Sequence, residues 1–290
     1  MVTLDRHDPL ATLTALKGEV REQPDNTKLR VFFFQLLCVV GDWPGAARQL
    51  EILADLDAST LAMVAMYRPA LANEPARADI FAGQREPHIM GKPPTWLADL
   101  IRANGLLNEQ QPEAAAQARA RAFEQAPTSS GTIDGQPFAW IADGDTRLGP
   151  LCEAIIGETY YWIPFDHIHE INIEKPTDLR DMVWLPARFV WHNQGEAFGL
   201  IPTRYPGLQQ SDDPVYLMAS QTRWDEHEHD HITGTGQRVW ITEQESYSLL
   251  DIRHIQFAEK PDADDMSDDA GDEKHEAIIA SSASSPASDG

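Results

Sequence analysis

Two aspartates and an arginine stand close together in this sequence, where they could take part in chemistry. One residue separates Asp143 from Asp145, and Arg147 follows two positions later. Carboxylate oxygens at this spacing suit a hard divalent cation, as in the metal-carrying motif of a sugar-nucleotide transferase. The sequence shows no glycine-rich phosphate loop beside them. The other interpretation is a turn that caps a helix starting near Leu148, with the aspartates at its positive end.

Three histidines alternate with acidic residues in the segment 225–231. In an extended strand His227, His229 and His231 would share one face, and imidazoles bind zinc, nickel or copper. The alternative is a solvated hairpin loop, which the Thr-Gly-Thr-Gly sequence after His231 favours. We expect no resident metal and no other cofactor, and these histidines are the candidate ligands if a metal is bound.

The elements that would position these residues begin with a core helix. Residues 29–40 are apolar on nearly all sides at helical spacing, so other helices must surround them. The Gly41-Asp42 turn ends this helix. Similar periodicity predicts helices at 8–23, 43–55, 59–74, 96–107 and 112–125. Pro69 should kink or break the fourth of these six helices near Tyr67. Helix pairs with a glycine turn are typical of tetratricopeptide-type repeats.

The pattern changes at residues 127–131, where we place a domain boundary. Beyond it, short aromatic and β-branched runs between Gly, Pro and Asn residues predict strands at 160–163, 182–185, 189–191 and 239–241. A helix is predicted at 148–156 and a second short one near Pro164. We therefore expect a two-domain α+β chain. A tetratricopeptide-like helical domain occupies 1–127, and a smaller α+β domain with a mostly antiparallel sheet occupies 132–258.

Composition and charge exclude several classes of partner. The formal net charge of −23 argues against nucleic acid and anionic membrane surfaces as partners. The chain has two cysteines, Cys38 and Cys152, and its N-terminus has no apolar signal-peptide core, which indicates a cytoplasmic protein. Residues 261–290 hold nine acidic residues and one lysine, so we expect 259–290 to be a disordered acidic tail.

Several polar side chains are candidates for partner binding. Gln35, Tyr67 and Arg68 lie within apolar helices, where they either hydrogen-bond between helices or line a groove. Arginines are scarce in this acidic chain, and Arg180, Arg204 and Arg238 are expected to anchor buried carboxylates or turns. The complete set of candidate partner-binding residues is Gln35, Tyr67, Arg68, Asp143, Asp145, Arg147, Arg204 and Tyr205.

Longer segments of the chain resemble the ImpE/SciE/TagJ family, whose members are accessory proteins encoded with bacterial type VI secretion systems. The resemblance covers roughly residues 5–257. It rests on Leu29-Arg30 with Phe34–Val39, Gly41–Trp43, Leu53-Ala54 with Leu56–Ala58, Phe81–Gly83, Trp140–Pro150, Pro176 with Asp178–Asp181, Leu200–Gly207 and Gly236–Arg238.

This resemblance implies a non-enzymatic accessory of the contractile-sheath machinery. In the TagJ branch, the helical part is thought to bind the N-terminal helix of the small sheath subunit, alongside the AAA+ ATPase that recycles the sheath. A groove between helices suits such a guest because it buries the apolar face of an amphipathic helix. The alternative is a metal-dependent enzyme that uses the Asp143/Asp145 turn or the His227/His229/His231 loop. The oligomeric state is left open.

Overall fold

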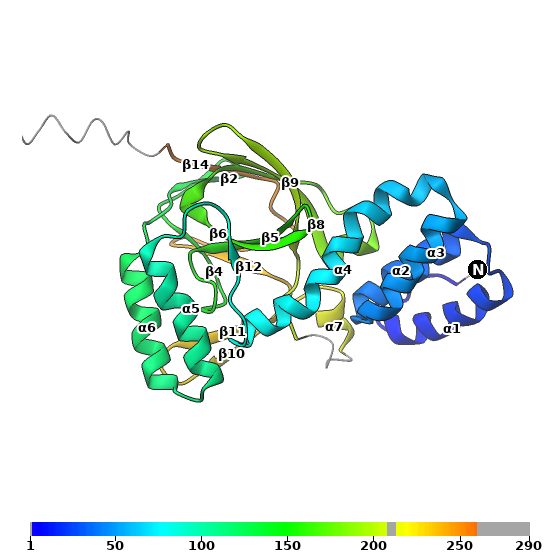
Figure 1. Cartoon of the computed structure of the whole chain (residues 1–290), viewed down its shortest axis with the longest axis horizontal. Coiled ribbons are helices and arrows are strands. Elements are labelled where there is room, and N and C mark those ends of the chain that lie inside the picture. The colour runs from blue at the N-terminus through cyan, green and yellow to red at the C-terminus, as the bar shows by residue number, and fades with distance from the viewer. Residues whose placement is uncertain (1, 208–212, 260–290) are drawn as a thin grey trace, which may run out of the picture. The chain divides into compact units, whose positions relative to one another are not determined.

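The computed structural model describes residues 2–207 and 213–259, and the expected acidic tail lies, apart from Glu259, outside these residues. Six helices make up most of the first half, with the two-residue strand β1 between the fourth and fifth, and the other strands follow from Gly131 onwards (Figure 1). The helices are α1 (Pro9–Glu22), α2 (Thr27–Val40), α3 (Trp43–Leu56), α4 (Leu61–Phe81), α5 (Thr95–Asn108) and α6 (Pro112–Gln125). The predicted order of helices before a mostly antiparallel sheet is confirmed.

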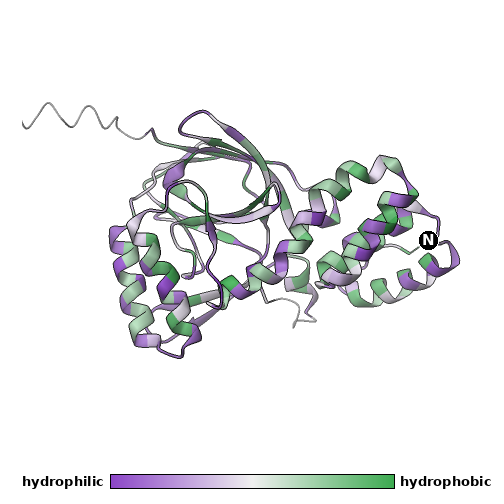
Figure 2. Cartoon of the chain, viewed as in Figure 1, coloured by the Kyte–Doolittle hydropathy of each residue, from purple (hydrophilic) through white to green (hydrophobic). Residues whose placement is uncertain are grey.

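Local sequence explains where the first helices begin and end. Asn26 caps α2 by accepting a hydrogen bond from the backbone N–H of Leu29, and Asp42 caps α3 through the N–H of Gly45. Gly41 ends α2 in the left-handed region, at φ 77°, which glycine adopts without steric cost. Figure 2 shows hydrophobic and hydrophilic residues mixed along α5 and α6. Buried residues recur there at the spacing of one helix face, at Leu97, Leu100 and Asn104 in α5 and at Ala115, Ala118 and Ala122 in α6.

A kink or a break was predicted at Pro69, and the break is wrong. Helix α4 runs without interruption through Pro69 and Pro75, and Figure 1 shows it as one ribbon. Pro75 is exposed and Pro69 is half-buried, and each removes one backbone hydrogen bond of the helix, to the carbonyl four residues earlier. Eight other residues of α4 are buried, and this packing offsets the cost of the two prolines.

Among the described residues the strands form three sheets. A nine-stranded sheet has the order β1-β6-β5-β9-β8-β7-β14-β2-β3; β1 is parallel to β6 and the other pairs are antiparallel. Its strands are β1 (His88–Ile89), β2 (Gly131–Ile133), β3 (Gln136–Phe138), β5 (Leu151–Ile156), β6 (Thr159–Pro164), β7 (Ile168–Ile173), β8 (Trp184–Trp191), β9 (Glu196–Pro202) and β14 (His254–Phe257).

The two smaller sheets and the short helices complete the fold. One sheet has the order β13-β12-β4, and the other is the hairpin β10-β11. Their bounds are β4 (Ile141–Asp143), β10 (Thr222–His227), β11 (His231–Gly236), β12 (Val239–Thr242) and β13 (Ser246–Ser248). Short helices are η1 (Ala58–Thr60), η2 (Phe165–His167), η3 (Leu179–Met182) and α7 (Pro214–Leu217). Helix η2 matches the prediction near Pro164.

The helix predicted at 148–156 is wrong, because Leu151–Ile156 form β5. All but the last of these six residues are buried, so both faces of the strand are covered. A short apolar run buried on both faces suits a central strand as well as a helix, and periodicity alone does not separate the two. The error matters because this strand carries Glu153, a buried carboxylate.

The expected boundary between 127 and 132 coincides with the change from helices to strands. Hydrophobic packing continues across it, since one core cluster contains residues of α1–α6 together with residues of β5, β6 and β8. The division into two domains therefore stays a prediction. Helix α4 contacts both β5 and β6, so it is the element that joins the helices to the sheet.

Candidate functional site

A buried cluster of charged side chains joins α4 to the sheet. Glu153 on β5 is 1% exposed and accepts hydrogen bonds from Arg77 at both oxygens, at 2.7 Å to Nε and 2.8 Å to Nη2. Arg238 and the hydroxyl of Tyr160 donate to the same carboxylate. Glu74, one turn before Arg77 on α4, lies 3.3 Å from it and also accepts from the indole of Trp184. The cluster is a network of charge-assisted hydrogen bonds.

Arg238 extends this cluster to the turn that the sequence singled out. It donates to Asp143 as well as to Glu153, and its Nε donates to the carbonyl of Pro202 at 3.0 Å. The other oxygen of Asp143 accepts from the Tyr205 hydroxyl at 3.0 Å and from the backbone N–H of Asp145. The predicted anchoring of a buried carboxylate by Arg238 is therefore confirmed.

Asp145 is fully buried and is held by Arg147. Its Oδ1 accepts from Arg147 Nε at 2.9 Å, and its Oδ2 accepts from Arg147 Nη2 at 2.5 Å. The backbone N–H of Gly234 donates to Oδ2 at 3.0 Å. A side chain at position 234 would clash with the ring of Tyr205, 2.3 Å from where its Cβ would lie, so glycine permits this approach.

The two aspartates have opposite pKa shifts. Burial raises the pKa of Asp143, although the charge of Arg238 acts against this rise. Burial also acts to raise the pKa of Asp145, but the charge and hydrogen bonds of Arg147 outweigh it and the pKa falls below its usual value. All four carboxylate oxygens accept hydrogen bonds within the chain. A metal ion could bind here only after these donors were displaced.

The helix that this turn was expected to cap is absent from residues 144–150, where the described chain forms a loop before β5. The aspartates therefore hold a loop instead of a helix end. Asp143 and Asp145 are 3% and 0% exposed, and Tyr205 is 1% exposed. Their side chains contact the interior of this chain, and their predicted role in partner binding stays untested.

Arg204 links the sheet to the end of α2. Its guanidinium donates to the carbonyls of Val39 at 2.7 Å and Cys38 at 3.3 Å, and to that of Leu217 at 2.5 Å. The last turn of α2 contains no basic residue of its own, so Arg204 supplies the positive charge that a helix C-terminus favours. Burial lowers the pKa of Arg204 to about 10. The carbonyl of Arg204 accepts from Arg77, which joins this contact to the charged cluster.

The remaining helical candidates occupy different surroundings. Tyr67 is buried beneath the guanidinium of Arg180, 4.7 Å from the ring centre, and burial raises its pKa to about 12. Gln35 is half-buried on α2, whereas Arg68 is exposed on α4. Arg68 lines a groove of about 410 Å³ between α3 and α4. The other lining residues are Trp43, Pro44, Ala47, Leu50, Glu51, Leu71, Ala72 and Pro75.

The histidine segment forms a hairpin. His227 and His231 are paired across β10 and β11, with their rings stacked 5.0 Å apart, while His229 and Asp230 have positive φ in the turn. The prediction that three histidines share one strand face is therefore wrong, and the hairpin interpretation is confirmed. Nowhere in residues 2–207 and 213–259 do three or more His, Cys, Asp or Glu side chains form a group suited to a metal ion.

His231 has a structural role in this hairpin. It is 9% exposed, and its Nδ1 lies 2.9 Å from the hydroxyl of Thr146 and 3.4 Å from Arg119 on α6. Arg119 can only donate, so Nδ1 must be the unprotonated nitrogen. Burial and the neighbouring Arg119 lower the pKa of His231 to about 4. The ring is therefore neutral near pH 7 and ties α6 to the hairpin.

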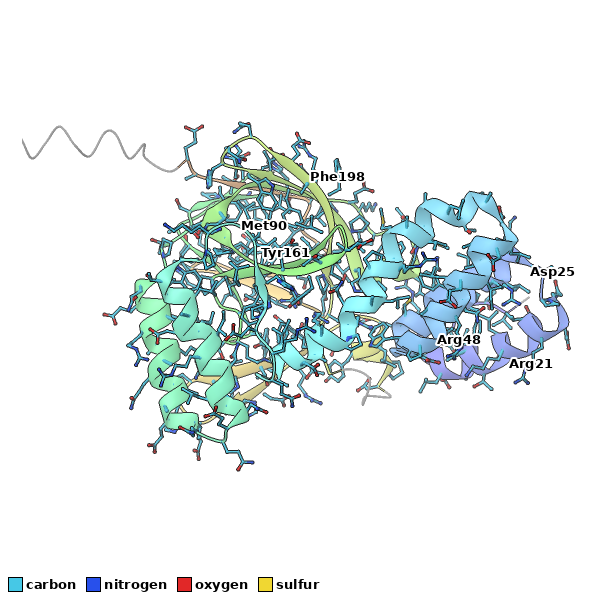
Figure 3. All side chains as sticks on the ribbon, viewed as in Figure 1. Arg21, Asp25, Arg48, Met90, Tyr161 and Phe198 are labelled. Atoms are coloured by element: carbon cyan, nitrogen blue, oxygen red, sulfur yellow. The ribbon has the colours of Figure 1, made fainter. Side chains whose placement is uncertain are left out.

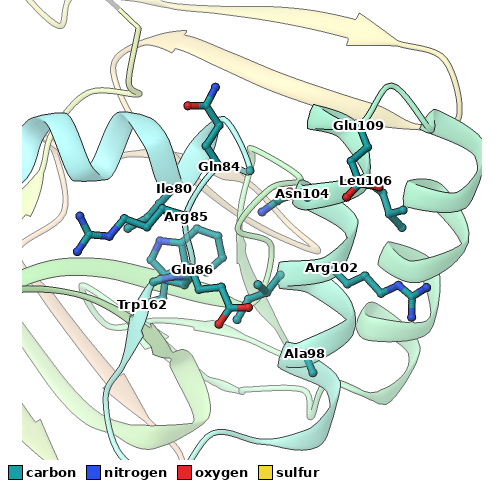
Figure 4. A pocket seen from close by; sticks show the side chains of 14 residues that line it. Ile80, Gln84, Arg85, Glu86, Ala98, Arg102, Asn104, Leu106, Glu109 and Trp162 are labelled. Atoms are coloured by element: carbon teal, nitrogen blue, oxygen red, sulfur yellow. The ribbon is translucent and has the colours of Figure 1, made fainter.

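A larger cavity lies where α4 ends beside α5. It measures about 580 Å³, and its described lining contains none of the residues predicted from the sequence. Figure 4 shows Trp162 beside Ile80 and Arg85, with Arg102 of α5 across from them; the guanidinium groups of the two arginines are directed away from each other. Asn104 belongs to this lining and donates to the carbonyl of Arg147 at 3.1 Å, so the cavity borders the loop that contains Asp145.

Sequence reasoning missed Glu74, Arg77 and Glu153, which are central to the charged cluster. A signal was present, because Glu153 interrupts the apolar run Leu-Cys-Glu-Ala-Ile-Ile and a carboxylate in such a run needs a cation. The cation comes from α4, 76 positions earlier in the chain, and no local pattern indicates that distance.

Comparison with known proteins agrees with the resemblance in the sequence. The family model described as ImpE protein matches residues 135–256. The type VI secretion system accessory component TagJ of Pseudomonas aeruginosa is 41% identical to the chain over 245 residues, which cover 84% of this chain and 86% of that protein. The chain belongs to the ImpE family. The model match includes the Asp143–Arg147 turn, β5 and Arg238.

A solved structure shows the same fold. The crystal structure of protein VPA1032 from Vibrio parahaemolyticus superimposes with a TM-score of 0.78 and covers 87% of this chain and 94% of that one. The two sequences are 22% identical, so the comparison shows a shared fold and nothing about function. Every helix among residues 2–207 and 213–259 is too short or too polar to cross a bilayer.

Proposed function

We propose that this ImpE-family chain is a non-enzymatic accessory protein of a cytoplasmic type VI secretion machinery, and that it binds a helical segment of a sheath-related protein. The groove between α3 and α4 carries the proposal. The name of the Pseudomonas relative supports the accessory role. The expected guest is the N-terminal helix of the small sheath subunit, with the AAA+ sheath-recycling ATPase as a further partner of the same process.

The groove has the chemistry that an amphipathic helix requires. Leu50 and Leu71 form its apolar floor, and the small side chains Ala47 and Ala72 leave room above them. Glu51 on α3 and Arg68 on α4 are exposed on opposite walls. An apolar guest face would be buried between the helices, while this pair of opposite charges would fix the guest's direction.

Enzymatic chemistry has less support from the geometry. The oxygens of Asp143 and Asp145 already accept hydrogen bonds from within the chain, and Nδ1 of His231 lies within hydrogen-bonding distance of Thr146. Cys38 and Cys152 are buried, and burial raises the pKa of both thiols. A nucleophile or general base needs an accessible face, which these groups lack.

The test is a binding titration with a labelled peptide. The probe is the N-terminal helix of the host's small sheath subunit, followed by fluorescence anisotropy against the full chain. Ala72→Glu places a carboxylate in the groove at an exposed position, so the fold should be kept. We expect at least about tenfold weaker binding, because the guest's apolar face would have to cover a charged carboxylate.

Arg48→Glu is the matched control, since Arg48 is an exposed residue of α3 outside the groove lining (Figure 3). It changes the net charge in the same direction as Ala72→Glu and should alter binding less than about twofold. Equal weakening by both variants would move the site elsewhere. Failure of the wild-type chain to bind the peptide, together with a tagged pull-down that recovers no sheath protein, would contradict the proposed partner.

A further inference from the structure

A second groove lies where α4 meets the sheet, apart from the groove between α3 and α4 that we propose for the guest helix (the guest groove). It measures about 530 Å³ and is bordered by Ala65 and Met66 of α4 and by residues of β5, β8 and β9. Its floor includes Ile155 and Leu200, each 3% exposed. Phe198 on β9 lines the same groove and is 71% exposed, and Met66 is 49% exposed. Phe198 is the most exposed large hydrophobic side chain of the described residues (Figure 3).

An exposed aromatic ring beside an apolar hollow indicates an interaction surface. Phe198 does not fill the hollow of its own chain, since its ring remains mostly in solvent. The projecting ring and the hollow belong to one patch. A surface with both parts is complementary to itself, which is the property that a two-fold symmetric contact needs.

The charges of this patch are also complementary to themselves. Arg188 is already paired with Glu170 at 3.2 Å and with Glu196 at 2.9 Å. Glu174 and Arg253 both line the groove, and neither forms an ion pair within the residues that the structure describes. They are close in the fold, because the backbone N–H of Ile173 donates to the carbonyl of Arg253.

Hydrogen bonds within the chain fix the orientation of the Arg253 side chain. Its guanidinium donates to the carbonyls of Leu250 at 2.6 Å and Ile252 at 2.5 Å, so its direction is fixed before any partner arrives. A two-fold axis near this end of the groove would set Glu174 of each copy against Arg253 of the other. The same axis would allow Phe198 of each copy to enter the opposite hollow.

We infer that this patch is the contact surface of a homodimer, in which a second copy of the chain occupies the groove. The inference concerns a different face from the guest groove and does not depend on the identity of the secretion partner. Its elements are the exposed Phe198, the hollow beneath it and the unpaired Glu174 and Arg253.

The experiment is sedimentation velocity of the full chain over a range of concentrations. The wild-type chain should reach about twice its monomer mass of 32.4 kDa at micromolar concentrations. Phe198→Ser should weaken dimerisation at least about tenfold, because two rings leave the interface for each substitution. Phe123→Ser is the control, since Phe123 is 37% exposed on α6 and lies outside the patch.

A charge exchange tests the two-fold geometry directly. Glu174→Arg and Arg253→Glu should each weaken dimerisation about fivefold or more, because each places like charges together twice. The double variant restores both pairs with their charges exchanged and should return to within about twofold of wild type. Since Glu174 is exposed, circular dichroism should show an unchanged fold for its variant.

The outcomes are decisive in both directions. Weakening by the single variants and recovery in the double variant support the two-fold contact. A wild-type chain that remains monomeric at about 200 µM overturns it, as does a dimer that Phe198→Ser leaves unchanged. A double variant as weak as the singles would also overturn it, because Glu174 and Arg253 would then not face each other across the two copies.

Discussion

The charged cluster around Glu153 and the groove between α3 and α4 differ in almost every physical property. The cluster is buried, rich in ion pairs and satisfied by its own chain. The groove is open, mostly apolar, and carries one exposed charge on each wall. The residues whose types suggest chemistry lie in the cluster, whereas the groove is built from leucine, alanine and proline. In this molecule, conspicuous polar residues hold the fold together, and it is a groove of plain apolar residues that we propose as the site for a guest.

Among the tests of this difference, we expect Arg238→Met to have the largest effect on stability. This change removes the charge between Asp143 and Glu153 and leaves both carboxylates in the interior with fewer donors. Breaking a buried pair in this way costs about 3–5 kcal/mol, so the free energy of unfolding should fall by that amount. Urea denaturation followed by circular dichroism measures it. A loss below about 1 kcal/mol would show that the cluster contributes little.

Arg204→Met should have a smaller effect. It removes the hydrogen bonds to the last turn of α2, while Arg77 can still donate to the backbone carbonyl at position 204. Hydrogen bonds from a charged group contribute about 1.5–3 kcal/mol, so we expect a loss near 2 kcal/mol. Hydrogen exchange should show faster opening of α2 than of β8. Equal acceleration in both elements would mean that Arg204 stabilises the whole unit evenly.

The role of His231 in the β10-β11 hairpin can be tested through the pH dependence of stability. Because the pKa of His231 is about 4 in the folded chain and near 6.5 when unfolded, the unfolded chain binds the extra proton first as the pH falls. The contribution of neutral His231 to the free energy of unfolding is therefore fully present above about pH 6.5. It is lost progressively between about pH 6.5 and 4, and the loss is about 2 kcal/mol at pH 5.

His231→Asn removes this titration, so the difference in stability between pH 7 and pH 5 should be smaller in the variant than in the wild-type chain. Comparing the two chains cancels the contributions of the many carboxylates, which titrate in both. Identical pH dependence in the two chains would rule out a neutral, buried His231.

The smallest effect on stability is expected in the groove. Arg68 is exposed and has no ion pair within the described residues, so Arg68→Ala should change the free energy of unfolding by less than about 0.5 kcal/mol. The same variant should weaken the sheath-subunit peptide about threefold if Arg68 contacts a carboxylate of the guest. Loss of stability without loss of binding would reverse the distinction between groove and cluster.

Much of the fold could be predicted from the sequence because periodicity is a local property. The bounds of α6 were predicted as they are found, and the apolar stretch at 29–40 became the buried helix α2. Two errors had the same origin. Both α4 and β5 take their conformation from distant packing, which overrides a proline in the first case and a helical stripe in the second.

The candidate site was predicted unevenly for a related reason. Asp143, Asp145, Arg147, Arg204 and Tyr205 were recognised individually, and the structure brings them together through Arg238 and Arg77. Whether these side chains come together depends on which strands are neighbours in the sheets, and the spacing of residues along the sequence does not give that strand order. The groove was expected as a type of surface, but its walls became known only when α3 and α4 were seen to be adjacent.

Helix α4 contributes residues to both grooves, Arg68 and Leu71 to the groove between α3 and α4, and Ala65 and Met66 to the groove beside the sheet. A ligand that displaces this helix at one groove changes the shape of the other. Thermodynamic linkage then requires reciprocity: if self-association strengthens guest binding by some factor, guest binding must strengthen self-association by the same factor. With two guest grooves on a symmetric pair, attachment to a polymer of repeated subunits would also gain from effective concentration, so a modest affinity at each groove could give durable attachment.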